Sequence, residues 1–156
     1  MLKVIGLGNI LRGDDGIGPV IIKELEKLKN SLQIQLYDVG SDAFTILDHL
    51  LGSEPVLIID CARMGKEPGT VIKMLARDAE FHRANIGISL HGYSLTEVWQ
   101  IARSLGVKNE LSAIGVEPYA MDFNTGISEA IKKSIPKILQ LVAEEAYKNA
   151  KKNSHN

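Results

Sequence analysis

Three acidic residues and one histidine stand where side chains often do chemistry in proteins of alternating strands and helices. Asp15 follows a glycine-rich loop and Asp38 closes an alternating segment. Asp60 ends a continuous apolar run, and His91 lies in a Gly/Ser-containing loop before a helix-like segment. Each alone has a structural explanation, as a helix cap, a turn former or a surface or core histidine. Together they form a ligand set suited to a divalent metal.

The glycine-rich stretch, GLGNILRGDDGIGP, runs from Gly6 to Pro19. It follows an apolar segment, so the chain is predicted to form a strand, a loop and then a helix. Glycine permits positive φ and a close approach of backbone to a ligand. In open α/β sheets, ligands bind at the carboxyl ends of the strands, where this loop would lie. We therefore expect the chemistry at this loop.

Two adjacent acids, Asp14 and Asp15, stand where the loop turns into the helix. An acid at this place commonly caps a helix, because it accepts hydrogen bonds from free N–H groups and interacts favourably with the helix dipole. One capping acid is routine. Two adjacent acids predict that one of them has a further role.

Segments with the periodicity of strands and helices alternate along the chain. Strands are predicted at 2–5, 32–39, 56–59, 70–75 and 110–116, and helices at 17–28, 42–51, 95–105 and 127–146. An irregular connection with a short helix is expected over 76–88, and Pro136 should kink the last helix or divide it. The sequence therefore predicts a single α/β domain over 1–150, with a mostly parallel twisted sheet and helices on both faces, and a disordered tail over 151–156.

Composition excludes several classes of function. The 156 residues are 45% hydrophobic and 24% charged, as in a globular domain. Lys and Arg total 18 against 19 for Asp and Glu, so no charge excess indicates binding to nucleic acid or to a membrane. No apolar run approaches the roughly 20 residues that span a bilayer, and no cationic leader precedes one. We expect a cytoplasmic protein without a signal peptide.

Other interpretations of the loop and of the single cysteine are weaker. A dinucleotide fingerprint would need glycine or alanine at Leu11, although Asp38 could still bind a ribose. A phosphate loop of the GxxxxGK[ST] type is absent. Cys61 follows a buried run, so it is better interpreted as a small buried hydrophobe than as a nucleophile paired with His91.

Several motifs together carry a family likeness. GLGNILRGDDGIGP closely resembles the N-terminal signature of the hydrogenase maturation endopeptidases, which follow the pattern GxGNxLxxDxGxG. The likeness continues in the expected order through YDVGSDAF, LIIDCAR, SLHGYSL and IGVEP, and it covers nearly the whole chain. Enzymes of this family trim a C-terminal extension from the large subunit of nickel–iron hydrogenase after nickel has been inserted.

The resemblance implies roles for particular residues. Asp15, Asp60 and His91 match the positions that contact the metal and carry the reaction, and Asp38 matches a further acid with a less defined role. The family often has glutamate at position 15, so the shorter aspartate leaves Asp14 as an alternative ligand.

The same resemblance implies a cofactor and a partner. The metal would be nickel supplied by the hydrogenase large-subunit precursor, although another divalent metal could occupy the site. Two other classes stay open. One is a non-catalytic nickel metallochaperone with the same ligands, and the other is a dinucleotide-binding module.

Overall fold

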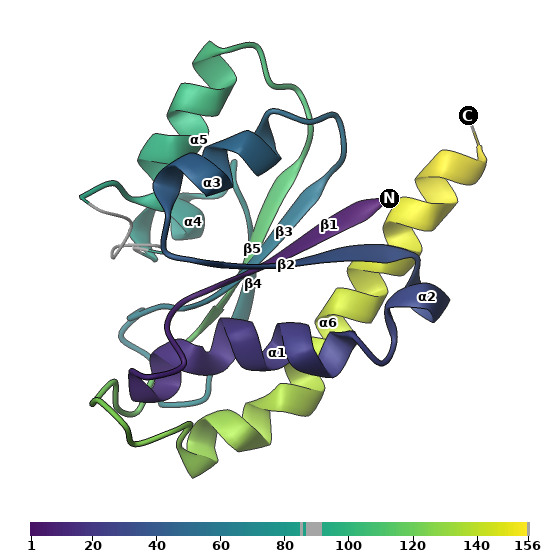
Figure 1. Cartoon of the computed structure of the whole chain (residues 1–156). Coiled ribbons are helices and arrows are strands. Elements are labelled where there is room, and N and C mark those ends of the chain that lie inside the picture. The colour runs from purple at the N-terminus through teal and green to yellow at the C-terminus, as the bar shows by residue number, and fades with distance from the viewer. Residues whose placement is uncertain (85, 87–91, 156) are drawn as a thin grey trace.

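The computed structural model describes residues 1–84, 86 and 92–155. These residues contain a five-stranded sheet in the order β2-β1-β3-β5-β4 (Figure 1). Its strands are β1 (Leu2–Leu7), β2 (Ile34–Gly40), β3 (Val56–Cys61), β4 (Val71–Leu75) and β5 (Leu111–Val116). All neighbours pair in parallel except β4, which runs antiparallel to β5 at the edge. The predicted mostly parallel sheet is confirmed.

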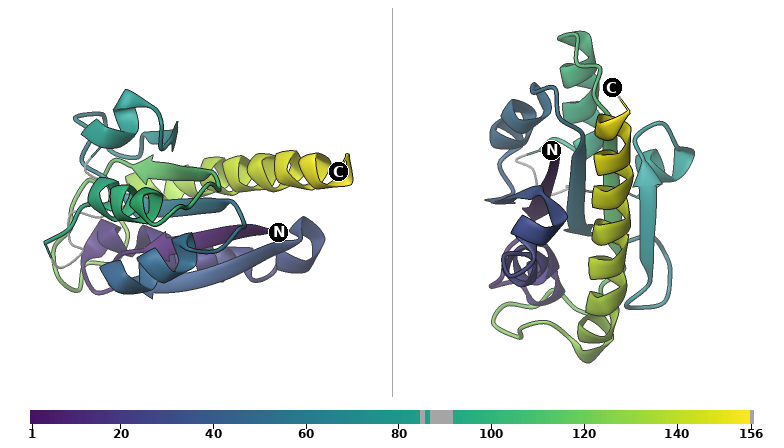
Figure 2. Two further views of the ribbon diagram at one scale, coloured as in Figure 1. Left: turned by 90° about the horizontal axis from the view of Figure 1, so that it is seen from above. Right: turned by 90° about the vertical axis from the view of Figure 1, so that its right-hand side faces the viewer.

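Helices cover both faces of this sheet, as predicted. On one face lie α1 (Ile17–Leu25) and α6 (Glu129–Ser154), and on the other lie α3 (Ala43–Leu50) and α5 (Leu95–Ser104) (Figures 1 and 2). Three shorter elements complete the described fold: the 3-10 turn η1 (Gly13–Gly16), α2 (Lys29–Leu32) and α4 (Ala79–Arg83). No helix within the described ranges is long and apolar enough to cross a membrane.

The central strand β3 is buried along its whole length. Leu57 and Ile59 pack in the core beneath α1 and α6, whereas Val56 and Ile58 pack in the core beneath α3 and α5. A strand buried on both faces requires apolar residues at consecutive positions, because successive side chains point to opposite faces. This explains the uninterrupted apolar run in the sequence.

The strand order reverses between β1 and β3. From β1 the chain crosses to β2 on one side, while β3 pairs with β1 on the other side. In open α/β sheets such a switch point opens a crevice at the carboxyl ends of the two strands, and ligands bind there. The loop after β1 and the last residues of β3 therefore flank the expected binding position.

The C-terminal part of the chain differs from the sequence prediction. Pro136 lies inside α6, which continues as one helix and is not divided in two. Residues 151–154, where the sequence predicted a disordered tail, continue the same helix in the structure. Lys151 and Lys152 lie in the last turn, where their positive charges interact favourably with the helix dipole. Lys152 Nζ also lies 2.9 Å from Glu110 Oε2.

Helix α1 lies directly on the backbone of the sheet. A Cβ atom added at Gly18 would be 2.1 Å from the carbonyl oxygen of Leu7 and 3.0 Å from that of Ile59. A Cβ atom at Gly6 would be 2.7 Å from the carbonyl oxygen of Gly18. No side chain fits between these segments, so glycine at both positions allows α1 to approach the carboxyl ends of β1 and β3.

Gly18→Ala should therefore destabilise the protein. The added methyl group would meet backbone atoms of β1 and β3, which cannot move independently, and we expect the free energy of unfolding to fall by at least about 2 kcal/mol. Gly52→Ala is the matched control, because its Cβ would first meet the flexible ends of Lys3 and Glu54. Urea unfolding of both variants measures the difference. Equal losses of stability would contradict the packing argument.

Candidate active site at the carboxyl edge of the sheet

Loops from distant parts of the chain meet at the carboxyl ends of the parallel strands. The loop after β1 and the segment 117–128 after β5 lie together at this edge, at the left of Figure 1. Main-chain hydrogen bonds join them: Asn124 N–H donates to the carbonyl of Leu11, and Asp14 N–H donates to that of Ala120, both at 2.9 Å. The two loops thus form one continuous surface beside the switch point.

Asp15 is held rigidly in this loop. The residue is only 9% exposed, and its Oδ2 accepts a hydrogen bond from the backbone N–H of Asn9 at 2.9 Å. Gly8, with φ +112°, lies so close that an added Cβ would be 2.0 Å from the carbonyl oxygen of Asp15. The glycine spacing of the loop therefore allows the chain to fold back and present this acid.

Asp60 lies on the other side of the switch point. It occupies the penultimate position of β3, is 4% exposed, and pairs in register with Gly115 of β5. The strand β3 contacts η1, the turn that carries Asp15. Burial raises the pKa of the Cys61 thiol, and the nearby negative charges of both acids raise it further. The structure therefore brings Asp15 and Asp60 into the same region.

Asp14 has a different role from its neighbour. Its fully buried carboxylate accepts four hydrogen bonds, from the backbone N–H groups of Tyr119 (2.8 Å), Ala120 (3.0 Å) and Ser128 (2.7 Å) and from the hydroxyl of Ser128 (2.9 Å). These donors occupy the carboxylate, which favours a structural role for Asp14 over the role of alternative metal ligand. It clamps the loop after β5 onto the loop after β1.

Asp38 points to a different face of the sheet from Asp60. It is exposed and pairs in register with Gly6, which also pairs with Ile59. Because side chains alternate between the two faces of a sheet, Asp38 shares a face with Ile59, and Asp60 points to the opposite face. Asp38 and Asp60 thus point to different faces of the sheet, and the less defined role that the sequence predicted for Asp38 stays a prediction.

The predicted third ligand, His91, lies outside the described residues. The helix that follows begins at Ser94, whose hydroxyl accepts from Glu97 N–H, while the Glu97 carboxylate accepts from Ser94 N–H. This capping box stabilises the first turn of α5. That turn lies at the carboxyl edge of the sheet, because α5 runs back toward the start of β5. Across residues 1–84, 86 and 92–155, no three His, Cys, Asp or Glu side chains are grouped to hold a metal. The three-ligand site stays a prediction.

Glu117 is a structural acid of this edge that the sequence interpretation did not assign. It follows β5 directly, is 7% exposed, and accepts a hydrogen bond from Met64 N–H at 2.5 Å. It thereby holds the loop after β3 next to the end of β5. The signal was present, because Glu117 ends a buried strand in the same way as Asp60.

Cys61 is a buried thiol in apolar surroundings. Burial raises its pKa far above the ordinary value, and the negative charges of Asp60 and Asp15 raise it further. Its Sγ lies 3.7 Å from the sulfur of Met121. A thiol held in the protonated form is a poor nucleophile, which supports the interpretation of Cys61 as a packing residue.

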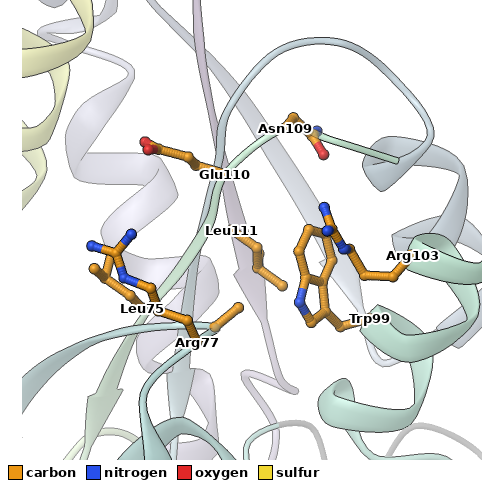
Figure 3. A pocket seen from close by; sticks show the side chains of 8 residues that line it. Leu75, Arg77, Trp99, Arg103, Asn109, Glu110 and Leu111 are labelled. Carbon is orange, nitrogen blue, oxygen red and sulfur yellow. The ribbon is translucent and has the colours of Figure 1, made fainter. Parts of the chain in front are cut away.

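A separate pocket lies at the opposite, amino edge of the sheet (Figure 3). Its volume is about 330 Å³, and its walls include Trp99 and Arg103 from α5 and Leu111 from β5. Trp99 is half-buried, packs against the core beneath α5 and lines this pocket. None of the acids discussed above contributes to it, so the chemistry predicted from the sequence lies elsewhere.

Asp14→Asn should destabilise the protein in a pH-dependent way. Burial alone would raise the pKa of Asp14, but hydrogen bonds from Ala120, Ser128 and Tyr119 hold it below its ordinary value of 3.8. The unfolded chain therefore takes up this proton first as the pH falls. We expect a loss of about 2 kcal/mol at pH 7. The difference from wild type should shrink below the ordinary pKa, toward the lower pKa of the folded protein.

Urea unfolding between pH 3 and pH 7 measures this dependence. Asp122→Asn, an exposed acid in the same loop, is the control and should leave stability nearly unchanged. A difference between Asp14→Asn and wild type that stays constant over this range would contradict the role of the ionised carboxylate.

The Cys61 thiol should react slowly in the native protein. At pH 8 we expect alkylation by iodoacetamide to be at least about tenfold slower than that of glutathione, because the thiol is buried and its pKa is raised. Mass spectrometry of the alkylated protein follows the rate, and unfolding in urea should remove the protection. Native alkylation at the glutathione rate would show an accessible thiolate instead.

Comparison with known proteins identifies the family. The model of the hydrogenase maturation proteases named HycI matches residues 19–145. A Methanocaldococcus jannaschii protein, provisionally named as a hydrogenase maturation protease, is 30% identical over 152 residues, covering 92% of this chain and 86% of its own. The delta subunit of coenzyme F420 hydrogenase from Methanothermobacter thermautotrophicus is 28% identical, with coverage of 92% and 93%.

A solved structure agrees with these sequence relatives. The hydrogenase maturating endopeptidase HybD of E. coli superposes with a TM-score of 0.75 at 25% identity, covering 90% of this chain and 88% of its own. The family model, the sequence relatives and the fold agree with the motif pattern, and the chain belongs to the hydrogenase maturation proteases, a family of peptidases.

Proposed function

We propose that this protein cleaves the C-terminal extension from the large-subunit precursor of a nickel–iron hydrogenase after nickel insertion. In this proposal Asp15, Asp60 and His91 contact the nickel that the precursor carries. The observation that supports it most is the pair of buried acids, Asp15 and Asp60, on the two sides of the switch point in a maturation-protease fold.

The chemistry of the two acids suits a divalent cation. A carboxylate buried away from water is costly to keep ionised unless an opposite charge or hydrogen bonds compensate. Asp15 accepts a hydrogen bond from a backbone N–H, and a bound nickel ion would supply the positive charge near both acids. A neutral imidazole from His91 would add a nitrogen ligand without adding charge.

Nickel belongs to the substrate in this proposal. Three ligands from the protease leave coordination positions for the precursor's own ligands, so nickel could be bound by both proteins at once. A precursor without nickel would lose this shared contact and bind weakly. The metal would thereby report that insertion is complete before the extension is removed.

Intact mass spectrometry tests the proposed reaction. A nickel-loaded precursor and a nickel-free control are incubated with the protein, and the mass of each is measured before and after. Loss of one defined C-terminal fragment from the loaded form alone is expected. Cleavage of both forms would contradict recognition through nickel. Cleavage of neither would contradict the peptidase assignment and favour a metallochaperone.

Isosteric variants test the site assignment. Asp15→Asn and Asp60→Asn should each slow cleavage of the loaded precursor by more than about a hundredfold, since even outer-shell residues of metal sites often cost about 10 to 100-fold. The matched control is Asp48→Asn, because Asp48 is an exposed acid of α3 that was not predicted to belong to the site. Circular dichroism and thermal melting confirm that each variant is folded. Full activity of both site variants would exclude the assignment.

A further inference from the structure

Arg12 is a cation with no anionic partner beside the candidate site. Its Nε is buried and has no hydrogen-bond acceptor among the described residues, and its side chain forms no ion pair there. Its guanidinium carbon lies 5.8 Å from the centre of the Phe123 ring. Buried donors in folded proteins are nearly always paired, and arginine cannot lose its charge. Within the described residues, the buried Nε–H of Arg12 therefore lacks an acceptor.

The nearest acids in the sequence do not neutralise Arg12. The Asp14 carboxylate is occupied by four donors from the loop after β5. Asp15 accepts its hydrogen bond from Asn9 instead. Arg12 is thus close in sequence to two carboxylates, and both accept hydrogen bonds from other groups. The described acids of this loop therefore leave Arg12 available for an acceptor from another molecule.

Large exposed apolar side chains lie on the same joined loops as Arg12. We call them the apolar rim: Ile10, Leu11, Tyr119 and Phe123, which are 60%, 56%, 71% and 69% exposed. The hydrogen bond between Leu11 and Asn124 and the Asp14 clamp hold the two halves of the rim together. A cluster of exposed apolar residues is typical of a surface that contacts another protein. This rim is continuous with the loop that carries Asp15.

We propose that Arg12 binds a carboxylate of the precursor's C-terminal extension while the apolar rim contacts the residues around it. This inference rests on the proposed function, because a precursor docked at Asp15 would pass over Arg12. The planar guanidinium can donate two parallel hydrogen bonds to a carboxylate, and Phe123 holds it in place. The carboxylate is either an acidic side chain of the extension or the terminal carboxylate of the precursor.

Steady-state kinetics on the nickel-loaded precursor tests this role. Arg12→Gln should raise KM by about tenfold or more and change kcat by less than about twofold, as expected for a lost charge-assisted contact. Arg12→Lys keeps the positive charge but not the planar guanidinium with its two parallel donors. Its KM should therefore lie between those of Arg12→Gln and wild type. Arg77→Gln is the control, because Arg77 is exposed at the distant pocket of Figure 3 and should leave KM unchanged.

Changes in the precursor identify the carboxylate. One set of precursors has each acid of the extension replaced by its amide, and another carries two added glycines that displace the terminal carboxylate. The change that removes the true partner should raise KM for wild type but not for Arg12→Gln. An unchanged KM in folded Arg12→Gln, or additive effects for every precursor, would overturn the proposal. Failure of wild type to cleave any loaded precursor would instead overturn the proposed function, and the Arg12 role with it.

Discussion

The contact between α1 and the backbone of the sheet is the constraint on which the rest of the edge depends. Gly18 and Gly6 lie against each other, and Gly18 lies against the carbonyl of Leu7, with no room for a side chain. Because α1 starts at this contact, the turn before it is forced back over the end of β1. Asp15 is in that turn, and the neighbouring strand β3 carries Asp60 next to its last residue. A packing requirement therefore sets the position of two acids that the proposed reaction needs.

The two adjacent acids of the loop divide their roles through their hydrogen bonds. Asp14 accepts four hydrogen bonds from residues more than a hundred positions later in the chain. Asp15 accepts a hydrogen bond from Asn9 N–H, within its own loop. The clamp made by Asp14 also brings Phe123 over Arg12. One structural carboxylate thus organises both the candidate metal site and the surface around it.

Much of this arrangement could be predicted from the sequence, because local patterns determine it. The apolar run of β3 and the helical spacing in α5 identified their elements, and the end of a buried strand identified Asp60. That Asp38 and Asp60 point to different faces depends on strand register, which the sequence pattern did not specify. The roles of Asp14 and Arg12 arise from contacts with the loop after β5, over a hundred residues away. Contacts between such distant segments leave no periodic pattern in the sequence.

The coordination of nickel in the complex tests the central claim most directly. X-ray absorption at the nickel edge can be recorded for the loaded precursor alone and with the folded, inactive Asp60→Asn or the wild-type protein at low temperature. If Asp15, Asp60 and His91 contact the metal, wild type should add oxygen and nitrogen ligands at roughly 2.0 to 2.1 Å, the distances usual for such donors at divalent transition metals. The Asp60→Asn variant should add fewer of these ligands to the nickel ion. A nickel spectrum that does not change when wild type binds the precursor would contradict the account.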